Sequence, residues 1–277
     1  VLAVSEKVED AVNNYFASLP EDNAMIAQDA FVEMVKSGEE LFILDIRQAD
    51  VYQEGHIKGA YNLPWGPEAI PENLDKLPAD ETIYVYCYTA QTANQTVALL
   101  NFAGFDAKSV RFGWNLGISR VNGYEEIVET KLTELPAATS YEIDPEIKSA
   151  IIDYYQGLAD VDNTMFKNYK ISEDILKMSL DAEQDLLILS IRQSSAFAEG
   201  HIPGAVNIPW GRGMQEYFGQ LPSGEKIVVY CYTGQTAGQA VAGLRMLGYD
   251  AVSLNGGMGT AANKPSGWAN KGYELVP

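Results

Sequence analysis

Apolar positions recur along the chain at two spacings, one typical of helices and one typical of buried strands. Helical spacing predicts helices over residues 8–19 and 28–36, and short continuous apolar runs predict strands over 41–45 and 83–86. Helices that alternate with buried strands indicate an α/β fold, in which a mostly parallel sheet carries helices on both faces.

The whole pattern occurs a second time, about 145 residues further along the chain. The recurring segments are LFILDIRQ (41–48) with LLILSIRQ (186–193), EGHIKGAYNLPWG (54–66) with EGHIPGAVNIPWG (199–211), and IYVYCYTAQTA (83–93) with IVVYCYTGQTA (227–237). A repeat of this length is the size of a domain, so we expect a duplicated domain and not a solenoid. The predicted domains are residues 1–136 and 137–277, and a segment of Pro and small residues at 135–140 is the predicted linker.

Each repeat is expected to begin with its own covering helix. Residues 8–19 and 147–158 carry apolar side chains at helical spacing, and each segment has an aromatic pair near its end. We expect each helix to cover one face of the domain that it precedes. The other predicted elements are helices at 172–178, 91–104 and 235–248, strands at 186–190, 60–63, 205–208, 106–112 and 250–254, and crossovers at 68–77 and 214–221.

The two cysteines of the chain occupy equivalent positions of the repeat, directly after a predicted strand and shortly before a predicted helix. At such a strand end the N–H groups of the loop converge on one point, and the positive end of the helix favours a negative charge there. Cys231 and Cys87 are therefore candidate nucleophiles. Because each lies in its own domain, we do not expect a disulfide between them. The alternative is an inert, buried cysteine that packs as a small hydrophobic residue.

A nucleophilic thiolate and its anionic product need a cradle of hydrogen-bond donors. We expect this cradle from the backbone N–H groups of the six residues that follow each cysteine. Gly234 would permit the turn that aims these groups inward, and threonine hydroxyls would add further donors. The residues are Tyr232, Thr233, Gly234, Gln235, Thr236 and Ala237 after Cys231, and Tyr88, Thr89, Ala90, Gln91, Thr92 and Ala93 after Cys87.

Together, these motifs resemble those of the rhodanese (sulfurtransferase) family, twice over and along essentially the whole chain. The resemblance is carried by Asp/Ser-Ile-Arg, by Gly-His-Ile-x-Gly-Ala, by the short loop that starts at the cysteine, and by the NGG turn at 255–257. It implies two rhodanese-like domains, each a mostly parallel sheet flanked by helices on both faces. It also implies that a sulfane-sulfur donor leaves a persulfide on the cysteine and that a thiol or cyanide acceptor removes it.

Phosphatases of a similar fold are excluded by the cysteine loop itself. They use a longer loop that ends in an Arg, which binds the phosphate oxygens with two hydrogen bonds. Here the loop is short, and neither copy contains Arg or Lys. Phosphoryl transfer without a cation would leave the charge of its transition state without stabilisation.

The sequence departs from the family pattern at positions that usually carry charge. Arg or Lys is absent from both loops, and Val51 and Ala196 stand where Glu or Arg is common. This less cationic pocket leaves the donor open among thiosulfate, polysulfide and persulfide. Ala90 replaces a loop glycine, which would cost about 1 kcal/mol if the position requires a positive φ. Ser190 replaces the usual Asp, so we expect weaker support around Arg192.

Four charged or aromatic residues are further candidates for the pocket. Arg47 and Arg192 would either orient an anionic substrate or pair with a nearby carboxylate such as Glu54 or Glu199. The other two are the tryptophans that follow a proline in each repeat, Trp65 and Trp210, which would either wall the mouth of the pocket or pack in the core.

The histidines of the chain, His56 and His201, share one position of the repeat at a turn that enters a strand. A general base for the thiol is one interpretation. We favour the other, in which each imidazole binds backbone groups, because that is what the family places at this turn.

Composition and charge limit the classes of molecule that we expect the protein to bind. The formal net charge of −19 argues against nucleic acid and anionic membranes, and no apolar run approaches the ~20 residues of a membrane span. No Cys/His cluster has the spacing of a metal site and no phosphate-binding motif follows a first strand, so neither metal nor cofactor is expected. The sequence leaves the compartment open: a trimmed N-terminus would fit export to the cell envelope, and the cytoplasm is the alternative.

The sequence therefore predicts a sulfurtransferase that carries sulfur as a persulfide on Cys231 and on Cys87. Its partners would be a small sulfur donor and a thiol or cyanide acceptor. The alternative is a persulfide carrier or sensor that delivers sulfur to a protein partner with little turnover of small molecules. A scaffold without catalysis is disfavoured because both cysteines and both loops are present.

Overall fold

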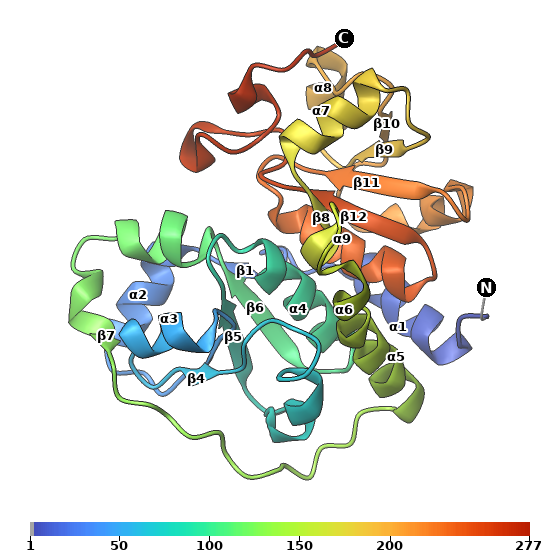
Figure 1. The fold of residues 1–277 in the computed structure, drawn as a ribbon. Helices are drawn as coiled ribbons and strands as arrows, with labels where there is room; N and C mark the ends of the chain where they lie inside the picture. Colours follow the sequence, from blue (N-terminus) through green and yellow to red (C-terminus); the bar gives the residue numbers. More distant parts are fainter. Residues whose placement is uncertain (1–2) are drawn as a thin grey trace. The chain divides into compact units, whose positions relative to one another are not determined.

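The computed structural model describes residues 3–277, which form two compact α/β units, each built on a five-stranded parallel sheet (Figure 1). The first sheet has the strand order β1-β6-β5-β2-β4, and its strands are β1 (Met25–Ile26), β2 (Phe42–Asp45), β4 (Tyr61–Asn62), β5 (Thr82–Tyr86) and β6 (Asp106–Val110). The second has the order β10-β9-β11-β12-β8, and its strands are β8 (Lys170–Ile171), β9 (Leu187–Ser190), β10 (Val206–Asn207), β11 (Lys226–Tyr230) and β12 (Asp250–Leu254). The predicted fold class is confirmed.

Helices flank both sheets. The α-helices are α1 (Glu6–Ala17), α2 (Gln28–Lys36), α3 (Ala49–Glu54), α4 (Gln91–Phe102), α5 (Pro145–Gln156), α6 (Leu158–Val161), α7 (Glu173–Asp181), α8 (Ser194–Glu199) and α9 (Gln235–Met246). The short 3-10 helices are η1 (Pro71–Lys76), η3 (Ile118–Arg120), η4 (Tyr124–Ile127), η5 (Lys167–Tyr169), η6 (Met214–Gln220), η7 (Ala261–Asn263) and η8 (Ala269–Lys271), and η2 (Gly113–Gly117) is a π-helix. An antiparallel pair, β3 (His56–Ile57) with β7 (Val128–Glu129), lies outside the first sheet.

Elements that the sequence did not predict are short. The edge strands β1 and β8 have two residues each, and α3 and α8 have six. Segments of this length contain too few positions to show a period, so their sequences do not distinguish them from loops.

The helices that follow the cysteines, α4 and α9, are buried nearly all round. Ten of the twelve residues of each helix are buried, including Gln95 and Gln239, which have no exposed surface. A helix is buried all round when a sheet covers one side and another element covers the opposite side. Polar side chains in such a position need hydrogen-bond partners.

The covering helix on α9 is α1, from the start of the chain. Tyr15 donates its hydroxyl to the side-chain carbonyl oxygen of Gln239 at 2.6 Å, and Phe16 packs edge-on against Trp210 at 6.0 Å between ring centres. The helix α9 carries Gly243 at this contact. A Cβ added to Gly243 would lie 2.4 Å from the Phe16 ring, so glycine is what allows the two helices to approach.

The covering helix on α4 is α5, and its contacts repeat those of α1 on α9. Tyr154 donates its hydroxyl to Gln95 at 2.5 Å, and Tyr155 packs edge-on against Trp65 at 5.5 Å. One contact differs between the two units. Tyr155 donates a hydrogen bond to Thr96 at 2.9 Å, whereas the second repeat has Phe16 without a hydroxyl and an alanine at the position of Thr96.

The two compact units therefore do not follow the predicted boundaries of residues 1–136 and 137–277. One unit is Pro20–Ala159, and the other combines the chain up to Leu19 with Asp160–Pro277. The expectation that each leading helix covers the domain it precedes is corrected. Helical spacing identifies an amphipathic helix, but the surface that accepts its apolar face is decided by packing with residues far away in the sequence.

The predicted linker at 135–140 also has a different place. This segment has no regular helix or strand and belongs to the unit of residues 20–159, because Thr139 donates its N–H to Asp75 O at 2.8 Å and Tyr141 donates its hydroxyl to Ala103 O at 2.6 Å. The unit boundaries lie after Leu19 and after Ala159.

The substitution Gly243→Ala should destabilise the unit that contains α1 and α9. The added Cβ displaces Phe16, and we expect this overpacking to lower the free energy of unfolding by about 1–3 kcal/mol, even though alanine favours a helix over glycine by about 1 kcal/mol. Urea unfolding measures the change. In a Phe16→Ala background the same substitution should be neutral or stabilising. Destabilisation that persists without Phe16 would contradict the assignment of this contact.

Candidate active site

The two cysteines lie at the carboxyl ends of the central strands of their sheets. Cys87 directly follows β5, and Cys231 directly follows β11. In each case the helix begins four residues later, at Gln91 in α4 and at Gln235 in α9. The carboxyl edge of a parallel sheet, close to a helix N-terminus, is where α/β folds place their binding sites.

The residue before each helix takes a left-handed conformation. Gly234 has φ 86° and Ala90 has φ 67°. The predicted turn is therefore present in both repeats, and the first repeat forms it with an alanine in a region that disfavours a Cβ. The turn therefore forms at this position with or without a glycine.

Each cysteine sulfur accepts hydrogen bonds from its loop, but from fewer groups than expected. Cys231 Sγ accepts from the N–H of Gly234 at 3.1 Å and of Ala237 at 3.4 Å. Cys87 Sγ accepts from Ala93 N–H alone among the described residues, at 3.4 Å. The donors reach the sulfur only from the last part of the loop, where the chain turns into the helix.

The loop is fixed from outside by the turn that follows the neighbouring strand. Trp114 N–H donates to Cys87 O, and Met258 N–H donates to Cys231 O, both at 2.8 Å. The residue before each donor is a glycine with a positive φ, Gly113 or Gly257, and a Cβ there would lie 2.6 or 2.7 Å from the cysteine carbonyl oxygen. Gly257 belongs to the NGG turn at 255–257, and the structure shows that both glycines allow their turn to approach the cysteine.

The side chains of the loop bond to groups other than the sulfur. Thr233 accepts a hydrogen bond from the Gln235 amide at 2.9 Å, and Thr89 accepts one from the Gln91 amide at 3.1 Å. The tyrosines after the cysteines, Tyr232 and Tyr88, accept from the N–H of Gln193 and Gln48. Within residues 3–277, no hydroxyl of Thr92 or Thr236 bonds the sulfur, so the expected threonine donors to sulfur are not present.

Both thiols are buried, at 2 % exposure for Cys87 and 3 % for Cys231. Neither sulfur is open to bulk solvent. Only a small part of either cysteine can meet a donor. This favours a terminal sulfur atom over a bulky reacting group.

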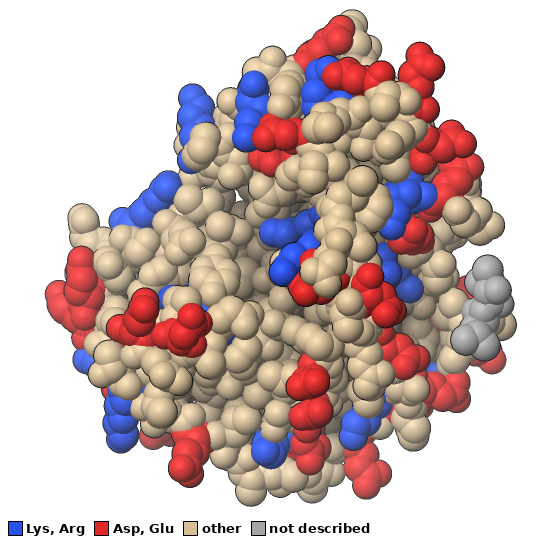
Figure 2. Space-filling view, viewed as in Figure 1, with Lys and Arg blue, Asp and Glu red and all other residues tan. Residues whose placement is uncertain are grey.

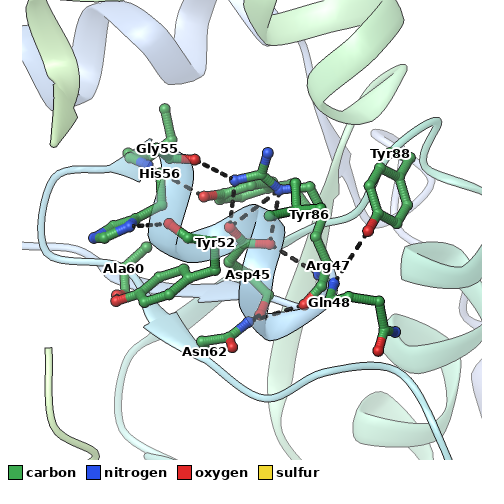
Figure 3. A network of polar contacts seen from close by, with 12 residues as sticks. Asp45, Arg47, Gln48, Tyr52, Gly55, His56, Ala60, Asn62, Tyr86 and Tyr88 are labelled. Atoms are coloured by element: carbon green, nitrogen blue, oxygen red, sulfur yellow. Dashed lines mark hydrogen bonds and ion pairs between the residues drawn. The ribbon is translucent and has the colours of Figure 1, made fainter. Parts of the chain in front are cut away.

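Arg47 is buried and paired with Asp45. Its Nη2 lies 2.7 Å from Asp45 Oδ2 and donates to Gly55 O at 2.8 Å, and its Nε binds the same carboxylate (Figure 3). The Trp114 ring covers the guanidinium with its centre 4.1 Å from Cζ. Burial lowers the pKa of Arg47, but the hydrogen bond and charge of Asp45 more than compensate and raise it above its ordinary value. The sequence left two partners open for Arg47, an anionic substrate or a nearby carboxylate such as Glu54. The structure shows a carboxylate as the partner, but it belongs to Asp45 and not to Glu54.

Arg192 has no such partner. Its position in the second repeat is the same, and it donates to Gly200 O as Arg47 donates to Gly55 O. Residue 190 is a serine, whose hydroxyl accepts only the Arg192 backbone N–H, at 3.3 Å. The expected pair with Glu199 does not form among the described residues, and the Arg192 Nε is buried without a hydrogen-bond partner.

The tryptophans after proline pack against the covering helices. Trp65 contacts Tyr155 and Trp210 contacts Phe16, and both are half-buried. These contacts fit the packing interpretation of Trp65 and Trp210.

A cavity of about 430 Å³ opens beside Arg47 in the unit of residues 20–159. Of the predicted site residues only Arg47 lines it. The lining residues are Arg47, Val51, Glu54, Gly55, Trp114, Asn115, Tyr124, Glu125 and Val128. Trp114 takes part in both features. Its backbone N–H binds the Cys87 carbonyl oxygen, and the residue also lines this cavity.

The histidines bind backbone carbonyl groups. His56 Nδ1 lies 2.7 Å from Tyr52 O and its Nε2 lies 2.9 Å from Lys131 O, and His201 Nδ1 lies 2.9 Å from Phe197 O. The structural interpretation is confirmed.

Two classes of feature have no representative in the part of the chain that the structure describes. Residues 3–277 hold no group of His, Cys, Asp and Glu side chains arranged to bind a metal ion. None of the helices in this range combines the length and apolar character that crossing a membrane requires.

Comparison with known proteins identifies the family. The profile of the Rhodanese-like domain matches residues 27–117 and again 172–262. The chain therefore belongs to the rhodanese family and carries the domain twice in tandem, as the sequence predicted.

The two curated relatives described next each match about one repeat. A sulfurtransferase from Allochromatium vinosum is 30% identical over 108 residues, which cover 39% of this chain and 94% of that protein. A putative sulfur carrier protein, YrkF from Bacillus subtilis, is 29% identical over 89 residues, which cover 32% of this chain and 45% of that protein. The crystal structure of a thiosulfate sulfurtransferase from Pseudomonas aeruginosa has a TM-score of 0.36 and 20% identity, over 90% of this chain and 46% of that one.

Ala90→Gly should stabilise the unit of residues 20–159. The residue keeps φ 67° without a Cβ that disfavours it, and we expect a gain of about 1 kcal/mol in the free energy of unfolding. Gly234→Ala, the converse change at φ 86°, should lose a similar amount from the other unit. Denaturant unfolding of both variants checks the pair. Equal and opposite shifts are the expected outcome, and a loss of stability in Ala90→Gly would contradict the strain.

Proposed function

We propose that this protein is a sulfurtransferase that carries sulfane sulfur as a persulfide on Cys231 and on Cys87. The observation that carries the proposal is the arrangement around Cys231, whose sulfur accepts two backbone N–H groups at the start of α9. Membership of the rhodanese family and the names of the Allochromatium vinosum and Bacillus subtilis relatives support sulfur transfer in general.

The proposed reaction has two displacements at sulfur. The Cys231 thiolate attacks the outer sulfur of the donor, a bond forms between Sγ and that sulfur, and the bond to the rest of the donor breaks. The leaving group takes the electron pair, as sulfite when thiosulfate is the donor and as a thiolate when an organic persulfide is the donor. An acceptor thiolate or cyanide then attacks the outer sulfur, and the cysteine thiolate leaves.

The loop would stabilise the persulfide anion with backbone dipoles. Gly234 and Ala237 already donate to Sγ, and among the described residues the N–H groups of Thr233 and Thr236 have no hydrogen-bond acceptor. These two free donors lie in the same turn and would serve the outer sulfur. Fixed N–H groups supply this stabilisation without a charged side chain, which fits a loop that has none.

The first site would work less well than the second. Cys87 accepts one N–H group where Cys231 accepts two, and Ala90 holds the turn in a strained conformation. We expect the Cys87 persulfide to form more slowly, because a weaker cradle stabilises the developing anion less.

Mass spectrometry of the intact protein tests the proposal. After incubation with thiosulfate and, separately, with polysulfide, wild type should gain up to two sulfur atoms, whereas Cys231→Ala and Cys87→Ala should each gain one. Loading should be faster in Cys87→Ala, which retains Cys231, by about tenfold if one hydrogen bond to an anion is the difference. Added cyanide or thiol should return the original mass.

Two results would count against the proposal. Absence of added sulfur with every donor would remove the sulfurtransferase function. Loading that neither cyanide nor small thiols reverse would favour the second candidate, a carrier that delivers sulfur to a protein. The observation that favours this second candidate is the similarity of one repeat to a putative sulfur carrier protein of Bacillus subtilis.

A further inference from the structure

The covering helices are exchanged between the two repeats. The helix α1 precedes the first repeat in the sequence but packs in the unit that contains Cys231, and α5 precedes the second repeat but packs in the unit that contains Cys87. Only Ser18 and Leu19 separate the end of α1 from Pro20, where the unit that contains Cys87 begins. Each cysteine therefore lies in a unit that is completed by the leading helix of the other repeat.

The helix α1 is connected with the end of the Cys231 loop through α9. Tyr15 donates its hydroxyl to Gln239 Oε1 at 2.6 Å, and Gln239 has no exposed surface. Gln239 lies in the second turn of α9, two residues after Ala237, whose N–H donates to Cys231 Sγ at 3.4 Å. The bond from Tyr15 therefore holds the part of the helix that supplies a donor to the sulfur.

The same helix is connected with the start of the loop by a second route. The Phe16 ring packs edge-on against Trp210, with 6.0 Å between the ring centres. The Trp210 carbonyl oxygen accepts a hydrogen bond from the Gln193 side chain at 2.9 Å, and the Gln193 N–H donates to the hydroxyl of Tyr232 at 3.4 Å. Tyr232 directly follows Cys231. The helix α1 is thus connected with both ends of the loop that surrounds the sulfur.

The helix α5 makes the same two connections with the Cys87 loop. Tyr154 donates its hydroxyl to Gln95 at 2.5 Å, and Gln95 lies two residues after Ala93, whose N–H donates to Cys87 Sγ at 3.4 Å. The second route again joins an aromatic ring, a tryptophan, a glutamine and the tyrosine after the cysteine, and its members are Tyr155, Trp65, Gln48 and Tyr88. The contacts therefore recur in both units, although α1 and α5 come from opposite repeats.

We propose that the leading helix of each repeat sets the reactivity of the cysteine in the other repeat. Tyr15 is the positioning residue for Cys231, and Tyr154 is the positioning residue for Cys87. Each acts through a buried glutamine that fixes the backbone N–H donors around the sulfur, because hydrogen bonds to a thiolate stabilise this charged, nucleophilic form. The inference goes beyond the proposed function, since it concerns the thiolate whatever compound the cysteine reacts with.

The connection between each helix and its loop consists of uncharged groups. It runs through tyrosine and amide side chains, aromatic rings and backbone groups, and Gln239 and Gln95 are fully buried. Asp and Glu side chains are spread over the visible face of the molecule, interspersed with fewer Lys and Arg (Figure 2). Salt screens such exposed charges over about 10 Å at 0.1 M ionic strength, while buried groups are screened much less. High salt therefore separates the effect of the helices from that of the surface charge.

Alkylation by iodoacetamide at high salt measures the thiolate without any sulfur transfer. The thiolate attacks the methylene carbon of the reagent, a C–S bond forms, and iodide leaves with the electron pair. Cys87→Ser retains Cys231 as the target, and Cys231→Ser retains Cys87. The readout is the rate constant at neutral pH divided by its plateau value at high pH. This ratio reports the fraction of thiolate, because a change in the access of the reagent alters both rate constants equally.

The expected result is crossed between the repeats. Tyr15→Phe should lower the ratio at Cys231 by about threefold to tenfold, which is the order of effect for one hydrogen bond, and should leave the ratio at Cys87 unchanged. Tyr154→Phe should lower the ratio at Cys87 by a similar factor and leave that at Cys231 unchanged. An effect of Tyr15→Phe on Cys87, or no effect on either cysteine, would overturn the inference.

A matched variant separates positioning from a general loss of stability. Tyr155→Phe removes a fully buried hydroxyl from the same helix, keeps the ring that contacts Trp65, and copies the Phe16 of the other unit. It should leave the ratio at Cys87 unchanged. A loss as large as that of Tyr154→Phe would assign both effects to stability and contradict the inference.

A double-mutant cycle tests whether Tyr15 acts through the buried glutamine. Gln239→Met should lower the ratio at Cys231, and adding Tyr15→Phe should lower it no further. Additive losses would show that the hydroxyl does not act through Gln239 and would contradict the inference. If the crossed result is obtained but neither thiosulfate nor polysulfide adds sulfur to the protein, the control by the helices stands and the proposed sulfurtransferase function fails.

Discussion

The hydrogen bond between a glycine-led turn and the cysteine carbonyl group is the interaction on which each site depends. Trp114 or Met258 donates its N–H to the cysteine oxygen, and the following residue donates to the carbonyl of the tyrosine after the cysteine. These bonds hold the loop at its first two residues. The rest of the loop can then turn back, so that N–H groups from the start of the helix reach the sulfur. A side chain on Gly113 or Gly257 would collide with the cysteine carbonyl oxygen, so the contact tolerates no Cβ.

The same frame holds two buried arginines in different electrostatic surroundings. One carboxylate, at Asp45, decides whether the buried arginine that follows the strand is neutralised. The rest of the framework is equivalent, since the strand order and the position of each cysteine correspond between the repeats. A change of one side chain therefore alters the charge around this arginine without altering the loop that holds the sulfur.

The covering helices connect stability to these sites. The helix after each cysteine is buried on the side away from the sheet by α1 or α5, through a tyrosine–glutamine hydrogen bond and an aromatic contact with the tryptophan that follows a proline. The start of each helix supplies the N–H groups for the sulfur. Packing of a helix that lies far away in the sequence therefore helps to fix the donors around the thiol.

The sequence by itself determined the repeat, the parallel α/β class, the rhodanese resemblance and the two cysteines, because these depend on local patterns. Buried strands show as apolar runs, and a motif of contiguous residues shows directly. It also predicted the left-handed turn at Ala90 and Gly234. Only the tertiary structure decided that α1 covers α9 and α5 covers α4, that Asp45 and not Glu54 pairs with Arg47, and that few N–H groups reach each sulfur. These outcomes depend on distances between segments that the order of residues does not specify, so packing and hydrogen-bond geometry settle them.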